Sequence, residues 1–529
     1  MSRLAVILEG SILLRFALAV ASGVLIAFAF ADFDIWIFAF VGLTPLICSI
    51  VASHRLSESV LLGMAASTVT WLINVPWVIT VMSAHGGLPY ATGVAIYIAM
   101  AFYLAIWGGL FGFLTALLRV EQRAFLPWLL IPLCWAASEL GRTHLLTGFP
   151  WNLLASAIID VWPLVQISRW LGPFGIGALL VLPSVVISWL IMTRARTRKR
   201  GIVVAATLAV LAAWYLDGAS RGYTASDDFY RKLPKFKAAM LQPDISQEMR
   251  WDESNLMSIF ERMASMTKRA VDGRAEVIIW PESTVPLAYA STEFFRTYVE
   301  EMSRTHRADV ILGSIARDDA DESRLWNAAY LVTNGVTVGH YDKIRLVPFG
   351  EYVPMRKFLF FAEKLVRAVG TFQFGTNDRP LRGRFNYGPA ICYEVVFPSV
   401  VATQVRHGAD VIVTITNDAW FGRSSAPRQH LNSARLRAVE TDRYILRAGT
   451  TGISAVIDPT GRILEQLPLD AEGVLFGEFS PRRTITAYVR FGDWFAIASC
   501  VLAVGGGVYR SRRRFFEKQN AERRMKNEE

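Results

Sequence analysis

Cys392 stands at the end of a short apolar run in the stretch GPAICYEVVFP (388–398), within the polar part of the sequence. The chain has four cysteines, and Cys48, Cys134 and Cys500 lie inside long apolar runs. A thiol with no second cysteine nearby is either buried and inert or kept for its chemistry. A thiol nucleophile needs a base that takes its proton, and a cation or amide group that stabilises the developing oxyanion.

Two residues at the ends of predicted strands could meet these needs. Glu282 follows the stretch VIIWP, and Lys343 ends a predicted hairpin. The histidines are not obviously placed as a base: His340 lies just before the lysine, and His306 and His430 fall in predicted helical or loop segments. A carboxylate can act as the base when burial raises its pKa, so we expect Glu282 to be buried with a raised pKa.

Short β-branched runs that end in polar residues alternate with helical patterns between 217 and 490. The stretch 252–271 has the spacing of an amphipathic helix, and Asn334-Gly335 is a hairpin signal within 328–343. This alternation predicts an α/β or layered α+β domain around a buried sheet. The expected strands are 236–245, 275–283, 308–317, 388–394, 409–418 and strands within 443–466.

The rest of the chain is too apolar for an ordinary soluble protein. Hydrophobic residues make up 53% of the sequence and the mean hydropathy is +0.33. Runs of about 18 or more apolar residues are the signal of membrane spans, so we expect about eight transmembrane helices. They are 11–31, 35–53, 59–82, 90–118, 125–140, 163–192, 201–217 and 491–509.

Basic residues are concentrated in alternate loops between these runs. Arg55, the stretch 119–123, the stretch 193–200 and the tail from 510 are the basic segments. By the positive-inside rule, both termini are expected in the cytoplasm and the charged domain outside it. The net charge of +10 is thus explained by topology and contact with anionic lipid rather than by nucleic acid.

These patterns predict four regions. They are a membrane domain of about seven helices (1–217), an extracytoplasmic catalytic domain (218–490), a C-terminal transmembrane helix (491–509) and a basic cytoplasmic tail (510–529).

An ordered set of motifs resembles the apolipoprotein N-acyltransferases, which are membrane-bound members of the nitrilase superfamily. That superfamily uses a Glu-Lys-Cys triad on an αββα sandwich, and the same chain order holds here. The motifs are GFPW (148–151), WPES (280–283), YDKIRLVPFGEYVP (341–354), ICYE (391–394), TNDAWFG (416–422) and GTTGISAVIDPTG (449–461).

The resemblance implies a role for each matching residue. It makes Glu282 the general base, Lys343 the oxyanion stabiliser and Cys392 the nucleophile. The supporting positions are Glu351, which matches an additional essential carboxylate, Tyr393 and Glu394, which follow the nucleophile, and Trp251, which matches a functional tryptophan. Glu351 could orient the lysine or keep Glu282 basic.

The resemblance also implies a reaction. A phospholipid would acylate the cysteine, and the thioester would pass its acyl chain to the amino-terminal S-diacylglyceryl cysteine of an apolipoprotein. This would be the last step of bacterial lipoprotein maturation, at the inner membrane with the catalytic domain on the periplasmic side. No cofactor is expected, since no Cys or His spacing fits a zinc site and no nucleotide loop is present.

Two other functions stay open on the sequence alone. A membrane-tethered amidase would keep the triad and pass the acyl group to water, but would not need about seven spans. A transporter with an inert outer domain would be expected to carry internal repeats and ionisable groups deep in its spans, and neither stands out here.

The apolar stretch 355–374 has two interpretations. It could be a core helix, or a mobile arm that gates lipid with Phe358, Leu359, Phe360 and Phe361 on the outer leaflet.

Overall fold

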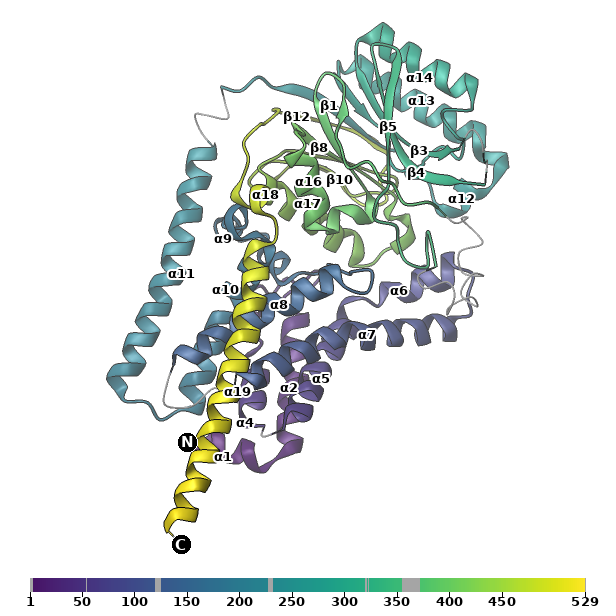
Figure 1. Ribbon diagram of the computed structural model, residues 1–529. Coiled ribbons are helices and arrows are strands. Elements are labelled where there is room, and N and C mark those ends of the chain that lie inside the picture. Colours follow the sequence, from purple (N-terminus) through teal and green to yellow (C-terminus); the bar gives the residue numbers. More distant parts are fainter. Residues whose placement is uncertain are drawn as a thin grey trace.

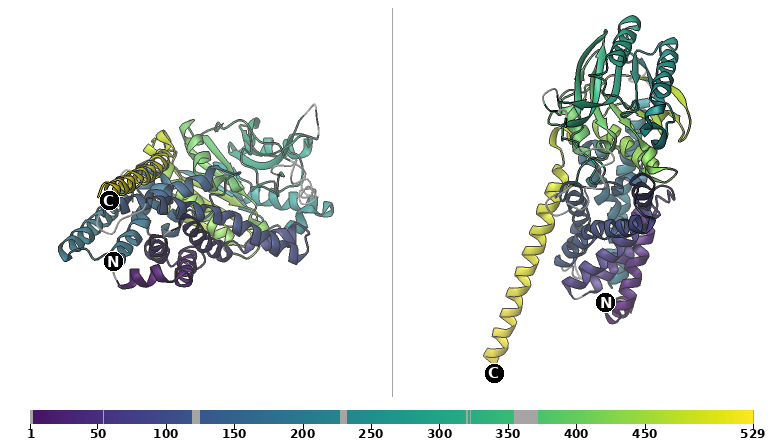
Figure 2. Two further views of the ribbon diagram at one scale, coloured as in Figure 1. Left: turned by 60° about the horizontal axis from the view of Figure 1, so that its bottom comes forward. Right: turned by 90° about the vertical axis from the view of Figure 1, so that its right-hand side faces the viewer.

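The chain folds into a helical part and a sandwich of two sheets stacked on one end of it (Figure 1). Both chain termini lie at the end of the helical part that is far from the sandwich (Figures 1 and 2). The computed structural model describes residues 3–53, 55–118, 125–226, 232–318, 321, 323–353 and 372–528.

Most of the helical part precedes the sandwich in the chain, and the long helix α19 (Trp494–Glu528) returns to it afterwards. The earlier helices are α1 (Arg3–Gly10), α2 (Ile12–Ala27), α3 (Phe38–Val41), α4 (Thr44–Ala52), α5 (Leu56–Asn74), α6 (Trp77–Thr80), α7 (Tyr90–Leu117), α8 (Ile131–His144), α9 (Trp162–Val165), α10 (Ser168–Met192) and α11 (Thr197–Ser226).

Four helices in the described ranges are long and apolar enough to cross a membrane: Leu56–Asn74, Tyr90–Leu117, Ser168–Met192 and Thr197–Arg221. Shorter apolar helices cover Ile12–Ala27, Phe38–Ala52 and Trp494–Arg510. The segment predicted at 125–140 is a short helical turn followed by α8, because Pro127 and Pro132 interrupt it. Several apolar helices are therefore present, and the count of eight spans stays a prediction.

The α5 and α7 helices pack with their backbones in direct contact. A Cβ atom on Gly63 would lie 2.1 Å from the carbonyl oxygen of Gly108. Only a residue without a side chain permits this approach, which is a common way for apolar helices to associate in lipid.

The sandwich has two six-stranded sheets, in the orders β12-β1-β2-β3-β4-β5 and β11-β10-β9-β8-β7-β6. The first sheet contains β1 (Phe236–Gln242), β2 (Val277–Ile279), β3 (Asp309–Arg317), β4 (Leu325–Thr333), β5 (Val336–Asp342) and β12 (Gly473–Phe479). The second contains β6 (Leu381–Arg382), β7 (Asn386–Ile391), β8 (Val411–Thr416), β9 (Ile445–Gly449), β10 (Ser454–Ile457) and β11 (Ile463–Leu467).

Helices cover the outer face of each sheet. The helices α13 (Leu256–Asp272) and α14 (Glu293–His306) cover the first sheet, and α16 (Pro398–Arg406) and α17 (Ala426–Thr441) cover the second. The short helices α12 (Gln247–Trp251) and α18 (Ala487–Phe491) complete the sandwich. The pair α16 and α17 lies between the second sheet and the helical part (Figure 1).

The strand β8 shows why this order of layers follows from the sequence. All six of its residues are buried. Val411, Val413 and Ile415 pack between the two sheets, whereas Ile412 packs on the side of α16 and α17. Because both faces of the strand are covered, its burial is continuous rather than alternating, and none of its residues is charged.

The predicted hairpin is confirmed. Its strands β4 and β5 are joined by Asn334 and Gly335, whose φ angles are 52° and 76°. Two successive positive φ angles define the tight turn that Asn-Gly favours.

Gln429 of α17 joins the sandwich to the helical part. Its side-chain oxygen accepts hydrogen bonds from the indole nitrogens of Trp151, at 2.7 Å, and Trp77, at 3.3 Å. Its amide nitrogen donates to the carbonyl oxygens of Ala31 and Asn74, each at 3.1 Å. One buried side chain thus satisfies polar groups from three segments of the helical part.

We predict that Gln429→Leu lowers the stability of the folded protein by about 2–4 kcal/mol, because it leaves two buried indole N–H groups without acceptors. The midpoint of thermal unfolding in detergent measures this change. Gln466→Leu, the same substitution on an exposed position of β11, is the matched control and should leave the midpoint unchanged. Equal midpoints for both variants would contradict the role of Gln429.

Candidate active site

Cys392 follows β7 directly and begins a single helical turn, Cys392–Val396, which we call the Cys392 turn. Its φ angle is +51°, a conformation that residues other than glycine rarely adopt. Its side chain belongs to the core between the sheets and is 8% exposed. The predicted nucleophile is therefore buried on a strained turn at the end of a strand, as residues at functional sites often are.

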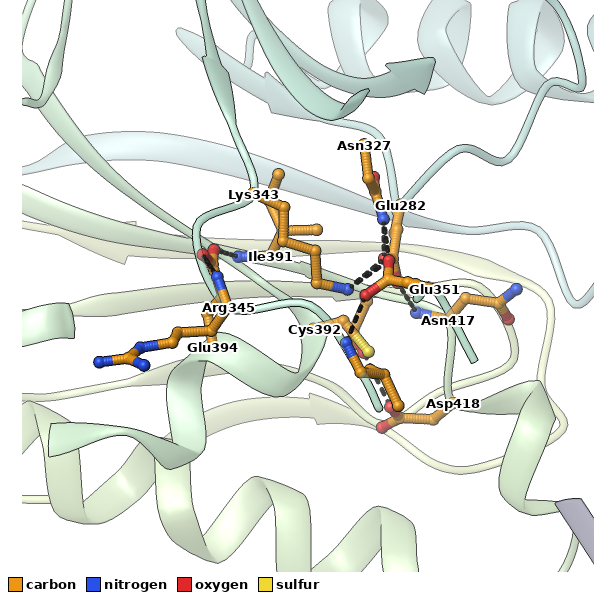
Figure 3. A network of polar contacts seen from close by, with 12 residues as sticks. Glu282, Asn327, Lys343, Arg345, Glu351, Ile391, Cys392, Glu394, Asn417 and Asp418 are labelled. Carbon is orange, nitrogen blue, oxygen red and sulfur yellow. Dashed lines mark hydrogen bonds and ion pairs between the residues drawn. The ribbon is translucent and has the colours of Figure 1, made fainter. Parts of the chain in front are cut away.

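Glu282, Lys343 and Glu351 meet beside this thiol (Figure 3). The Lys343 ammonium nitrogen lies 2.9 Å from Glu351 Oε1 and 3.2 Å from Glu282 Oε1. Glu282 follows β2, Lys343 follows β5, and Glu351 lies in the loop after Lys343. The structure thus brings together three of the predicted site residues and Cys392.

Asn327 completes this group, which we call the ion cluster (Glu282, Asn327, Lys343 and Glu351). Its Nδ2 donates to Glu282 Oε1 at 2.7 Å and to Glu351 Oε1 at 2.9 Å. Asn327 was not predicted from the sequence, although a polar residue in the apolar strand LWNAAYLVT is a usable signal.

Backbone amides fix the second oxygen of each carboxylate. Glu282 Oε2 accepts from the amide of Asn417 at 3.0 Å, and Glu351 Oε2 accepts from the amide of Val347 at 2.8 Å. Both carboxyl groups are therefore held in one orientation toward the lysine.

In the ion cluster, the ammonium of Lys343 and the two carboxylates each stabilise the charged form of the other. Burial works against the charged form of Lys343, but the carboxylates of Glu282 and Glu351 outweigh it and hold the lysine pKa well above its ordinary value. Burial alone would raise the pKa of Glu282, yet Lys343, the Asn327 hydrogen bond and Arg250 hold it below the ordinary value. The prediction of a raised Glu282 pKa is wrong, because the sequence does not reveal these partners.

The surroundings of the Cys392 thiol favour its neutral form, whereas those of Lys343 and Glu282 favour their charged forms. Burial, followed by the negative charge of Glu282, raises the pKa of Cys392, and the ammonium of Lys343 acts in the lowering direction without compensating. Cys392 thus rests as a neutral thiol at neutral pH beside an ionised Glu282. This pairing suits a mechanism in which the base takes the proton as the sulfur attacks.

Glu394 ties the Cys392 turn to the loop after Lys343 (Figure 3). Its Oε1 accepts from the amides of Ile344 at 2.6 Å and Arg345 at 3.0 Å, and from Tyr341 Oη at 2.9 Å. Its Oε2 accepts from the amide of Ile391 at 2.8 Å. Burial raises the pKa of Glu394 to about 7 against these hydrogen bonds.

Tyr393 faces the helical part. Its hydroxyl donates to the carbonyl of Gly148 at 3.1 Å, and its ring lies 6.4 Å from Phe149 and 6.5 Å from Trp151 between centroids. The GFPW motif (148–151) therefore reaches the Cys392 turn from the helical part.

Two predicted features are placed only in part. Trp251 is the last residue of α12, and its side chain lies outside the described part of the structure. The stretch 355–374, predicted as a core helix or a mobile arm, lies outside the described residues except for 372–374.

Comparisons with known proteins agree with this two-part architecture. The model of the apolipoprotein N-acyltransferase N-terminal domain matches residues 22–186, and the carbon-nitrogen hydrolase model matches residues 237–488. The apolipoprotein N-acyltransferase of Geobacter metallireducens is 33% identical over 92% of this chain and 93% of its own length. The chain belongs to the apolipoprotein N-acyltransferase family.

A second relative, the apolipoprotein N-acyltransferase of Methylococcus capsulatus, is 32% identical over 94% of this chain and 96% of its own length. The crystal structure of the C. elegans NitFhit protein matches 47% of this chain and 61% of that chain, at 21% identity and a TM-score of 0.39. The carbon-nitrogen hydrolase match and the two covered sheets confirm a nitrilase-like sandwich in this apolipoprotein N-acyltransferase family member.

We predict that Glu282→Gln lowers the pKa of the Cys392 thiol by at least about one unit, since it removes a negative charge that raises this pKa and leaves Lys343 in place. The pH dependence of alkylation by iodoacetamide, followed at Cys392 by peptide mass mapping, measures the shift. Glu293→Gln, on an exposed carboxylate of α14, is the control. A midpoint that stays or rises would contradict the electrostatic role of Glu282.

Proposed function

We propose that this protein transfers an acyl chain from a membrane phospholipid to the amino-terminal S-diacylglyceryl cysteine of an apolipoprotein. The family supports N-acylation of lipoproteins. The observation that carries the chemistry is Cys392 beside the ion cluster, because it supplies a nucleophile, a base and a fixed cation in one buried place.

In the first half-reaction, Glu282 accepts the proton of the Cys392 thiol as the sulfur attacks the ester carbonyl of the phospholipid. Lys343 pairs with the oxyanion of the tetrahedral intermediate. The carbon–oxygen bond then breaks, the leaving lysophospholipid oxygen takes the proton from Glu282, and a thioester remains on Cys392.

In the second half-reaction, the α-amino group of the acceptor cysteine attacks the thioester. The carbon–nitrogen bond forms, the carbon–sulfur bond breaks, and Glu282 relays the amine proton to the leaving sulfur. The product is an amide and a free thiol. A thioester is reactive enough toward an amine that this route needs no nucleoside triphosphate.

Glu351 acts through Lys343. Its carboxylate lies nearer the ammonium, at 2.9 Å, than that of Glu282, at 3.2 Å. This arrangement favours an orienting role for Glu351, which holds the lysine while Glu282 exchanges protons.

An amidase function is the second candidate, because the same site could pass the acyl group to water. It is less supported, since the family model that matches residues 22–186 belongs to apolipoprotein N-acyltransferases. A hydrolase would also gain nothing evident from a helical part packed against its Cys392 turn.

The sandwich is proposed to face the periplasm from the inner membrane, with both termini in the cytoplasm. Two features support this orientation. Both termini lie at the far end of the helical part (Figures 1 and 2), and the basic segments 193–200 and 510–528 lie near that same end.

Intact-mass spectrometry after incubation with phospholipid alone tests the proposed chemistry. We predict an acyl adduct on the wild-type protein that hydroxylamine removes, and none on Cys392→Ala. Cys500→Ala, which removes a half-buried thiol of α19, is the matched control and should form the adduct. No adduct on the wild type, or an adduct that persists in Cys392→Ala, would refute the thioester route.

Labelling with a membrane-impermeant maleimide tests the orientation. In spheroplasts, Lys268→Cys on the exposed side of α13 should be labelled at once, whereas Arg512→Cys in the C-terminal tail should be labelled only after lysis. The wild-type protein gives the background of its native thiols. The reverse pattern would contradict the proposed orientation.

A further inference from the structure

A second charged group lies behind Cys392, apart from the ion cluster. Asp418, His430 and Arg447 have no exposed surface. Asp418 Oδ1 lies 3.0 Å from His430 Nδ1, and Asp418 Oδ2 accepts from Arg447 Nη2 at 2.5 Å. Thr416 Oγ1 donates to Asp418 Oδ1 at 2.8 Å.

The imidazole of this group contacts the backbone of the proposed nucleophile. His430 Nε2 lies 3.0 Å from the carbonyl oxygen of Cys392. A carbonyl can only accept, so Nε2 carries the hydrogen and Nδ1 faces Asp418. The imidazole therefore holds the peptide plane that follows the strained Cys392 φ angle, a conformation that costs about 1–3 kcal/mol and persists only where its surroundings enforce it.

A tryptophan of the helical part stacks on one face of the same imidazole. The Trp151 ring stacks on His430 with 5.5 Å between centroids and 23° between planes. Arg142 of α8 donates to the carbonyl oxygens of Phe149 at 2.9 Å and Trp151 at 2.5 Å. The imidazole is thus fixed in its plane by Asp418 and above its plane by a segment of another part of the chain.

Stability alone is a weak reason for this arrangement. Replacing a buried charged group by well-packed apolar residues is often neutral or stabilising, so such groups are better evidence of a required geometry than of stability. The geometry enforced here is that of the residue proposed to attack the phospholipid ester.

We propose that His430 is a positioning residue that holds the Cys392 carbonyl, and through it the thiol, in the geometry of attack. The inference rests on Cys392 being the nucleophile. Asp418 and Arg447 orient the imidazole, and Trp151 makes this orientation depend on the helical part.

Two variants of His430 separate positioning from mere filling of space. The amide nitrogen of His430→Gln reaches about as far as Nε2 and retains a donor for the Cys392 carbonyl. The amide nitrogen of His430→Asn corresponds to Nδ1, which faces Asp418 at 3.0 Å and Arg447 at 3.1 Å, and leaves the Cys392 carbonyl without this donor. The readouts are the rate of acyl-adduct formation at saturating phospholipid, the KM for phospholipid, and the thermal midpoint. His407→Asn, on a partly exposed histidine after α16, is the control.

We expect His430→Asn to slow adduct formation by about 100-fold with KM nearly unchanged, and His430→Gln to stay within about threefold of the wild type. Equal rates in the two variants, or a loss that only follows the thermal midpoint, would overturn the positioning role. A wild type that forms no adduct would refute the proposed function instead.

If neither His430 variant folds, Trp151 provides the test. Trp151→Phe keeps a ring over the imidazole and should acylate at a rate near that of the wild type, whereas Trp151→Leu removes the ring and should be slower. Equal rates at equal stability would overturn the inference.

Discussion

The burial of one ammonium group constrains the whole sandwich. Lys343 is 1% exposed, and an isolated charge at that depth would cost several kcal/mol. It is tolerated because Glu282 and Glu351 lie within 3.2 Å of its nitrogen. These three residues leave the first sheet at different strand ends and loops, so both the strand order and the loop after β5 are needed to bring them together.

The helical part and the sandwich pack against each other and are not joined by linkers alone. The helices α16 and α17, which cover the second sheet, are themselves covered by Trp77 and Trp151 in one apolar core. Trp151 also stacks on Tyr393, the residue after Cys392, and on His430, which contacts the Cys392 carbonyl. The geometry of the site therefore depends on both parts folding against each other. This agrees with the comparisons, in which one family model matches each part.

The sequence was most informative about reactive residues that stand at the end of a strand. Glu282, Lys343 and Cys392 each stand at such an end, and the nitrilase-like fold followed from the motifs that contain them. The roles of Asn327 and His430 were not predicted, because the partners that give a polar residue inside a strand or helix its role are set by the pairing of β4 with β5, or by the packing of α17. The predicted direction of the Glu282 pKa shift was wrong for the same reason, since the shift depends on partners distant in the chain.

The sandwich is attached to the apolar helices at both ends, through α11 before β1 and α19 after α18 (Figure 1). A domain attached at both ends stays beside the surface in which the proposed substrates are anchored. Encounters then occur by lateral diffusion in two dimensions, and the concentration that matters is a number of molecules per unit area of membrane. With the phospholipid donor proposed above, turnover should vary with the mole fraction of that lipid in the bilayer and be insensitive to the volume of buffer around it.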